Sequence, residues 1–110
     1  MKADELVQCL HSRFSHYPIA VTNKVSFLNA YCDADFVTVS MGAIVEEFEV
    51  KVSRSDYLRD AKKTRHKIYS DHPDYRGTKP NRFWYVTAPD IINLADLPSY
   101  AGWMELQCVS

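Results

Sequence analysis

The sequence predicts one α/β domain in which helices flank a mixed β-sheet, and three observations support this prediction. The chain has 110 residues, 46% hydrophobic and 25% charged, which is typical of a single domain with its own core. Apolar residues at helical spacing alternate along the chain with short β-branched and aromatic runs. A predicted helix between two predicted strands requires a crossover, so part of the sheet should be parallel.

Local patterns predict the elements in chain order. Four apolar residues from Leu6 to Phe14 recur at helical spacing behind two acids, which predicts a helix over 3–14. Alternation and β-branched or aromatic composition predict strands over 19–28, 36–39, 44–52, 82–87 and 102–106. Residues 89–94 are expected to form one or two helical turns, and the breaker-rich stretch 71–80 a surface loop.

A helix should begin directly after the strand over 44–52. Ser53-Arg54-Ser55-Asp56 resembles a capping box, in which the serine oxygen accepts from a free backbone N–H of the first helical turn. The helix should reach about Tyr69. Its core stripe is expected to hold Tyr57, Leu58, Ala61, Thr64 and Ile68, and its other side Arg59, Lys62, Lys63 and His66.

The charge of the chain is unevenly distributed. Residues 51–67 hold seven basic and two acidic side chains, a net charge of +5. Because the whole chain has a net charge of −1, the other residues together carry −6. A basic stripe on a neutral protein is typical of a phosphate-facing surface, and equally of an ordinary solvated helix face.

Several function classes are disfavoured. The three glycines are isolated, so there is no glycine-rich phosphate loop for a nucleotide cofactor. Cys9, Cys32 and Cys108 have apolar neighbours and suit small buried hydrophobic residues better than a disulfide framework or a zinc site. The sequence lacks a membrane-length apolar run and a signal-peptide pattern, so we expect a cytoplasmic protein that does not bind a membrane.

Two carboxylates and a lysine are expected to meet at one end of the sheet. Glu49 and Lys51 lie two residues apart in a strand and therefore share a face. Asp35 precedes the neighbouring strand, and a hairpin around Gly42 would bring it beside them. Metal-dependent phosphodiester hydrolysis needs hard oxygen ligands and a cation that positions the attacking water.

In this interpretation Asp35, Glu49 and the backbone carbonyl of Val50 hold Mg²⁺ or Mn²⁺, and Lys51 is catalytic. The alternative is that Glu47, Glu49 and Lys51 form the solvated face of a half-exposed strand, which is the commoner meaning of a bare Glu-x-Lys.

The aromatic strand has two interpretations as well. Phe83, Trp84 and Tyr85 have the aromatic rings that stack on nucleic-acid bases. Alternation puts Phe83 and Tyr85 on one face and Trp84 on the other, so we expect them to pack in the core instead.

The order of these motifs resembles the PD-(D/E)XK nuclease superfamily, and in particular its MmcB-like DNA-repair proteins. The blocks that carry the resemblance are 34–39, 48–60, 82–89, 97–98 and 101–104, and Phe48-Glu49-Val50-Lys51-Val52-Ser53-Arg54 opens the most specific of them. The resemblance implies a restriction-endonuclease-like fold, metal ligands at Asp35 and Glu49, and a catalytic lysine at Lys51.

Further positions of the family pattern match Ser53, Asp56, Asp60 and Lys62, where roles in organising the helix or meeting DNA are implied. The resemblance assigns Glu5 to the first-helix acid of some superfamily members. The segment before Arg82 is longer and more polar than in the family, so no residue role is transferred there.

The leading hypothesis is therefore a Mg²⁺- or Mn²⁺-dependent DNA nuclease of repair or recombination. Arg54, Arg59, Lys62 and Lys63 would meet phosphates, and a homodimer would be needed to cut both strands at once. Two alternatives stay open. One is a non-catalytic DNA-binding or protein-interaction module on the same fold, and the other is a partner-binding or inhibitory protein whose acids are ordinary surface.

Overall fold

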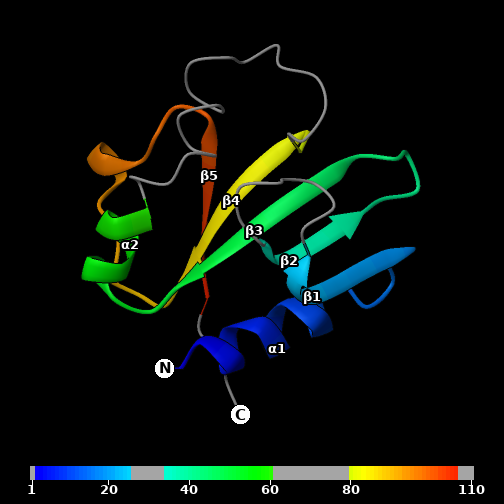
Figure 1. Ribbon diagram of the computed structural model, residues 1–110, viewed down its shortest axis with the longest axis horizontal. Coiled ribbons are helices and arrows are strands. Elements are labelled where there is room, and N and C mark those ends of the chain that lie inside the picture. The colour runs from blue at the N-terminus through cyan, green and yellow to red at the C-terminus, as the bar shows by residue number, and fades with distance from the viewer. Residues whose placement is uncertain (1, 26–33, 61–79, 107–110) are drawn as a thin grey trace.

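A computed structural model describes residues 2–25, 34–60 and 80–106 of the chain, without the side chains of 23–25. Five strands form one sheet in the order β1-β2-β3-β4-β5 (Figure 1). The elements are α1 (Ala3–Arg13), β1 (Ile19–Val25), β2 (Ala34–Val39), β3 (Val45–Lys51), α2 (Arg54–Asp60), β4 (Arg82–Thr87), the 3-10 helix η1 (Leu94–Asp96) and β5 (Ala101–Glu105).

The sheet is mixed, as predicted. β1, β2 and β3 pair in antiparallel fashion, whereas β4 lies parallel to both β3 and β5. The β2–β3 hairpin turns through Ser40–Ala43, where the N–H of Ala43 donates to the carbonyl of Ser40 at 2.9 Å. Ala43 has a φ of 61°, so the turn passes through the left-handed region. This hairpin returns the end of β3 to the start of β2.

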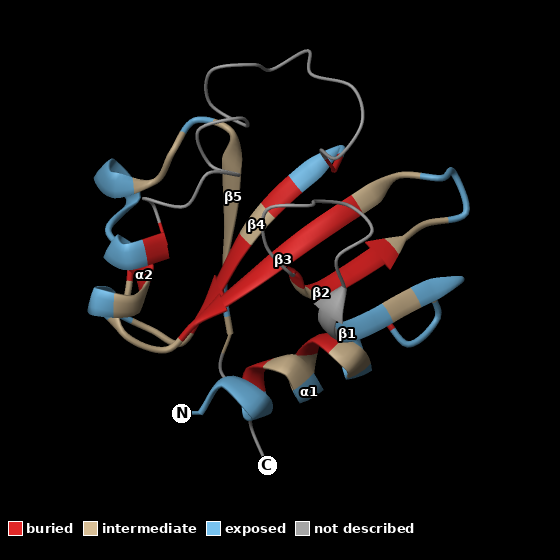
Figure 2. Ribbon diagram, in the orientation of Figure 1, coloured by how far each residue is buried: buried red, intermediate tan, exposed pale blue. Residues whose placement is uncertain are grey.

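The helix α1 covers one face of the sheet. Leu6, Leu10 and Phe14 recur at helical spacing and are buried against Phe36 and Phe48 of the sheet. The helix begins after Lys2, whose backbone N–H donates to the carboxylate of Glu5 at 3.2 Å. Figure 2 shows that the buried residues of α1 face the sheet.

The helix α2 covers the opposite face. Its predicted cap is confirmed, because the N–H of Asp56 donates to Oγ of Ser53 at 3.2 Å. Tyr57 is buried against Tyr85, with ring centroids 4.9 Å apart. The predicted core position of Leu58 is wrong, since Leu58 is 50% exposed. It lies about 100° around the helix from Tyr57, and Asp60, one turn on, is buried instead.

The predicted continuation of α2 cannot be compared with the structure. Residues 61–69, which include Lys62, Lys63 and His66, lie outside the described residues, as do 71–79 of the predicted loop. The predicted helical turns over 89–94 are wrong: the turn lies at Leu94–Asp96, and Asp90 has a φ of 68°, which interrupts a right-handed helix.

The aromatic strand β4 packs on both faces of the sheet, as predicted. Phe83 and Tyr85 are buried on the α2 side. Trp84 packs on the α1 side, and its indole N–H donates to Oε2 of Glu46 at 2.6 Å. All three rings therefore contribute to the core.

Cys9 takes part in a disulfide, so the expectation that it is a small buried hydrophobic residue outside any disulfide is wrong. Cys32 and Cys108 lie outside the described residues.

Within the described ranges, no helix is long and apolar enough to cross a membrane.

Candidate functional site

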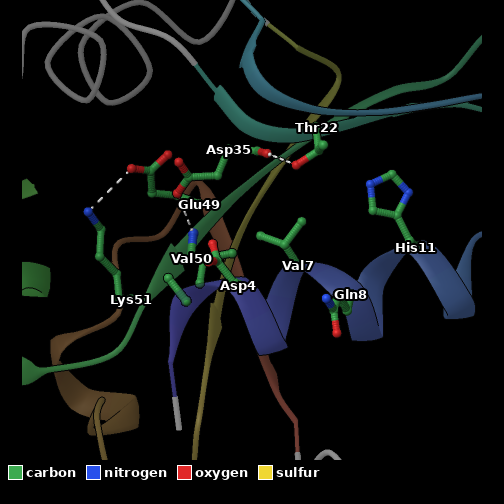
Figure 3. Close-up of a pocket in the computed structure, with 10 residues that line it drawn as sticks. Asp4, Val7, Gln8, His11, Thr22, Asp35, Glu49, Val50 and Lys51 are labelled. Atoms are coloured by element: carbon green, nitrogen blue, oxygen red, sulfur yellow. Dashed lines mark hydrogen bonds and ion pairs between the residues drawn. The ribbon is translucent and has the colours of Figure 1, made fainter.

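Asp35 and Glu49 lie side by side where the β2–β3 ladder ends. The ladder runs from Val39 opposite Val45 to Phe36 opposite Phe48, and the same register sets Asp35 opposite Glu49. At this point the N–H of Val50 donates to Oδ2 of Asp35 at 2.9 Å. The hairpin therefore makes the neighbouring pair of carboxylates that the sequence predicted (Figure 3).

Lys51 lies between two carboxylates from different elements. Its Nζ is 3.2 Å from Oε1 of Glu49, on the same strand, and 3.3 Å from Oδ1 of Asp60, on α2. The hydroxyl of Tyr85 donates to the other oxygen of Asp60, Oδ2, at 3.0 Å. The three charged groups and the phenol thus form one connected network under α2.

The charged side chains of β3 are buried. Glu47, Glu49 and Lys51 are 0%, 4% and 8% exposed, so the alternative of a solvated strand face is wrong. Alternation along β3 places them on the face that α2 and its flanking segments cover. Burying a charge costs several kcal/mol unless it is paired, so the contacts of Lys51 with Glu49 and Asp60 are needed to keep these groups in the fold.

An open cleft of about 600 Å³ lies between α1 and the ends of β2 and β3. Asp4, Gln8 and His11 line its α1 wall. The opposite wall is formed by Thr22, Asp35, Glu49, Val50 and Lys51. Figure 3 shows the carboxylates of Asp35 and Glu49 together on this wall, with Lys51 beyond Glu49.

The first helix brings a different acid to this cleft from the one expected. Glu5 receives the N–H of Lys2 and is used in starting α1, whereas Asp4 lines the cleft. Asp4 lies three residues before Val7, which also lines the cleft, so the two share a side of the helix.

The buried network also contains residues that sequence patterns missed. The alternation along β4 predicts only core packing for Tyr85, and only the family resemblance points to Asp60. Local spacing in the sequence gives no signal for the contact between these two residues, because Asp60 and Tyr85 lie 25 residues apart in the chain.

The predicted phosphate-binding arginines lie outside the cleft and have acidic partners. Arg54 pairs with Asp96 at 2.5 Å and Arg59 pairs with Asp56, and both arginines are exposed. Lys62 and Lys63 lie outside the described residues. Exposed ion pairs contribute about 0–1 kcal/mol, so either arginine can exchange its partner for a phosphate at little cost.

The donor set in the cleft suits a cation that needs few protein ligands. In the part of the chain that is described, no three His, Cys, Asp or Glu side chains are grouped as a metal site. Mg²⁺ takes one or two carboxylates and completes its octahedron with water or substrate oxygens. Asp35 and Glu49 supply two carboxylates, and Val50, whose backbone carbonyl is the third predicted ligand, also lines the cleft and donates its N–H to Asp35. These residues therefore fit Mg²⁺ or Mn²⁺.

Comparison with known proteins identifies a similar fold. No family model matches the sequence, and no curated protein matches it. Among solved structures, the chain is similar to the SPO1766 protein of unknown function from Silicibacter pomeroyi, with a TM-score of 0.67 and 16% sequence identity. The match covers 94% of this chain and 62% of that chain, so this chain spans less than two thirds of the neighbour's length. At this identity the likeness shows a shared fold.

Proposed function

We propose that this chain is a restriction-endonuclease-like, PD-(D/E)XK-type nuclease that hydrolyses DNA phosphodiesters with Mg²⁺ or Mn²⁺. Asp35, Glu49 and the carbonyl of Val50 are the proposed metal ligands, and Lys51 is the proposed catalytic lysine. The observation that carries the proposal is a buried lysine that pairs with Glu49 beside Asp35, on the wall of an open cleft.

The charge balance of the site supports a cation. Among the described residues that line the cleft, Asp4, Asp35 and Glu49 bring three carboxylates and Lys51 brings one ammonium. This negative excess favours a bound divalent cation.

The side chains of the cleft have separate roles in the proposed reaction. A bound Mg²⁺ polarises a phosphoryl oxygen and lowers the pKa of water. Asp35 is held by the N–H of Val50 and so presents its carboxylate in a fixed orientation. The ammonium of Lys51 lines the same cleft, where it can orient water and offset the negative charge that develops on the phosphate.

DNA binding is proposed to use the exposed basic residues near α2. Arg54 and Arg59, with Lys62 and Lys63, would exchange surface partners for phosphates, which predicts an affinity that falls steeply with salt. Cutting both strands at once would require a homodimer. The proposed setting is DNA repair or recombination in the cytoplasm, as in the MmcB-like proteins that the sequence resembles.

A cleavage assay tests the proposal. Purified chain is incubated with single-stranded, duplex and branched DNA in Mg²⁺, Mn²⁺ or EDTA, alongside Glu49→Gln and Lys51→Met. Glu105→Gln is the matched control, because Glu105 is exposed at the end of β5. We expect cleavage only with metal, a loss of about 100-fold or more in both site variants, and wild-type rates in the control.

Two outcomes would reject the proposal in different ways. Cleavage that persists in folded Glu49→Gln and Lys51→Met would reject the site. Absence of cleavage on every DNA substrate with either metal would reject the activity. Urea unfolding of each variant establishes that it is folded.

A further inference from the structure

Asp60 is a buried carboxylate that reaches the strand lysine from another element. It lies at the described end of α2, it is 1% exposed, and its Oδ1 is 3.3 Å from Nζ of Lys51. Unlike Glu49, it is not among the residues that line the cleft. Asp60 therefore contacts Lys51, the proposed catalytic residue, from outside the cleft.

Tyr85 fixes the orientation of this carboxylate. Its hydroxyl donates to Oδ2 of Asp60 at 3.0 Å while Lys51 contacts Oδ1, so two different partners engage the two oxygens. The Tyr85 ring packs edge-on against Phe83 and Tyr57, with centroids 5.1 and 4.9 Å apart. Burial and the Asp60 charge raise the pKa of Tyr85, so its hydroxyl stays a donor through the physiological pH range.

Glu49 alone would hold Lys51 weakly, because the bound metal ion and the Lys51 ammonium would compete for the same carboxylate. A carboxylate that ligates a divalent ion shares its lone pairs with that ion, and its attraction for a neighbouring ammonium falls. A buried ammonium that loses its partner is costly, and Lys51 would move toward solvent. A second carboxylate outside the cleft removes this conflict.

We propose that Asp60, oriented by Tyr85, is a positioning residue that holds Lys51 in place when Glu49 binds the metal. This inference rests on the proposed function for the roles of Glu49 and Lys51. The contacts themselves are testable without catalysis.

The first test follows the Lys51 ammonium by ¹⁵N NMR in metal-free buffer. We expect its protons to exchange with water about tenfold faster in Asp60→Asn than in wild type, and less so in Tyr85→Phe, which keeps the Asp60 charge. Asp90→Asn is the matched control, because Asp90 is exposed and its positive φ suits asparagine. Unchanged exchange in both Asp60→Asn and Tyr85→Phe would overturn the inference, whatever the protein does to DNA.

The second test separates positioning from folding. We expect Asp60→Asn to lower kcat for DNA cleavage about tenfold or more while KM stays within about twofold, and Asp60→Glu to restore part of kcat. If Asp60→Asn does not fold, Tyr85→Phe takes its place with a smaller loss of kcat. A folded variant with wild-type kcat would overturn the inference while leaving the nuclease proposal intact. A wild-type chain that does not cut DNA would reject the nuclease proposal, and the NMR test would still decide whether Asp60 holds Lys51.

Discussion

The side chain of Asp35 bonds the backbone of β3 beyond the last ladder pair: Oδ2 of Asp35 accepts from the N–H of Val50 at 2.9 Å. A hydrogen bond of this kind fixes a carboxylate more firmly than solvent does. It also holds the carboxylate beside Glu49, the position that the proposed metal site requires. Asp35 therefore has a structural role and a proposed ligand role, and mutations can separate the two.

Substitution of Asp35 should separate its hydrogen bond from its charge. Asp35→Asn keeps a carbonyl oxygen for Val50, so its free energy of unfolding without metal should lie close to that of wild type. Asp35→Ala leaves the N–H of Val50 without this acceptor and should cost about 1 kcal/mol. Urea unfolding in EDTA measures both, and equal losses in the two variants would show that the hydrogen bond is not what stabilises the fold.

The buried phenol of Tyr85 should make stability fall in alkali. Burial, followed by the Asp60 charge, raises the pKa of Tyr85 above the ordinary value of 10.0. Below about pH 10 both folded and unfolded chains keep the proton, so the contribution is complete. Above that pH the unfolded chain loses its proton first, and the free energy of unfolding should fall by up to about 1.4 kcal/mol per pH unit from this group.

Tyr85→Phe isolates that contribution. Tyr57, whose pKa is also raised by burial, is present in both proteins, so only the difference between the two slopes belongs to Tyr85. We expect a shallower decline in Tyr85→Phe between about pH 9 and 11, measured by urea unfolding. Parallel declines would mean that Tyr85 ionises in the folded chain as readily as in the unfolded one.

Gly102 should be required where β5 passes Trp84. A Cβ at position 102 would collide with the six-membered ring of Trp84, and that indole is tethered to Glu46 through its N–H. Gly102→Ala should therefore cost about 1–3 kcal/mol. Gly42→Ala is the matched control, since its Cβ would lie 3.9 Å from Oγ of Ser40, an ordinary contact. Thermal unfolding compares them, and a similar small change in both would contradict the packing described for Trp84.

The elements that the sequence predicts well are those whose signals are local. Alternation located β3 and β4, and the Ser53 hydroxyl located the start of α2. The short connection at Gly42 gave the antiparallel β2–β3 pair and hence the approach of Asp35 to Glu49. These features depend on residues that are neighbours in the chain or across one hairpin.

The burial of side chains and the contacts between residues distant in the chain are harder to predict from the sequence. Alternation along β3 shows that Glu47, Glu49 and Lys51 share a face, but it does not show that this face is covered. The contact of Lys51 with Asp60 depends on how α2 docks on the sheet, and the bond from Tyr85 depends on the parallel register of β3 and β4. Leucine is usually buried and aspartate usually exposed, but in α2 Leu58 is exposed and Asp60 is buried. Hydrophobicity alone therefore predicts the wrong buried face for α2.

Metal binding in the absence of DNA tests the central claim most directly. Titration of Mn²⁺ into the metal-free chain, with free Mn²⁺ counted by electron paramagnetic resonance, gives the number of sites and their affinity. We expect the wild-type chain to bind Mn²⁺, and Asp35→Asn and Glu49→Gln each to weaken binding about tenfold or more, a loss of about 1.4 kcal/mol. Glu105→Gln should bind as wild type does. A wild-type chain that leaves Mn²⁺ free, or variants that bind it equally well, would contradict the claim that Asp35 and Glu49 together hold a divalent cation beside Lys51.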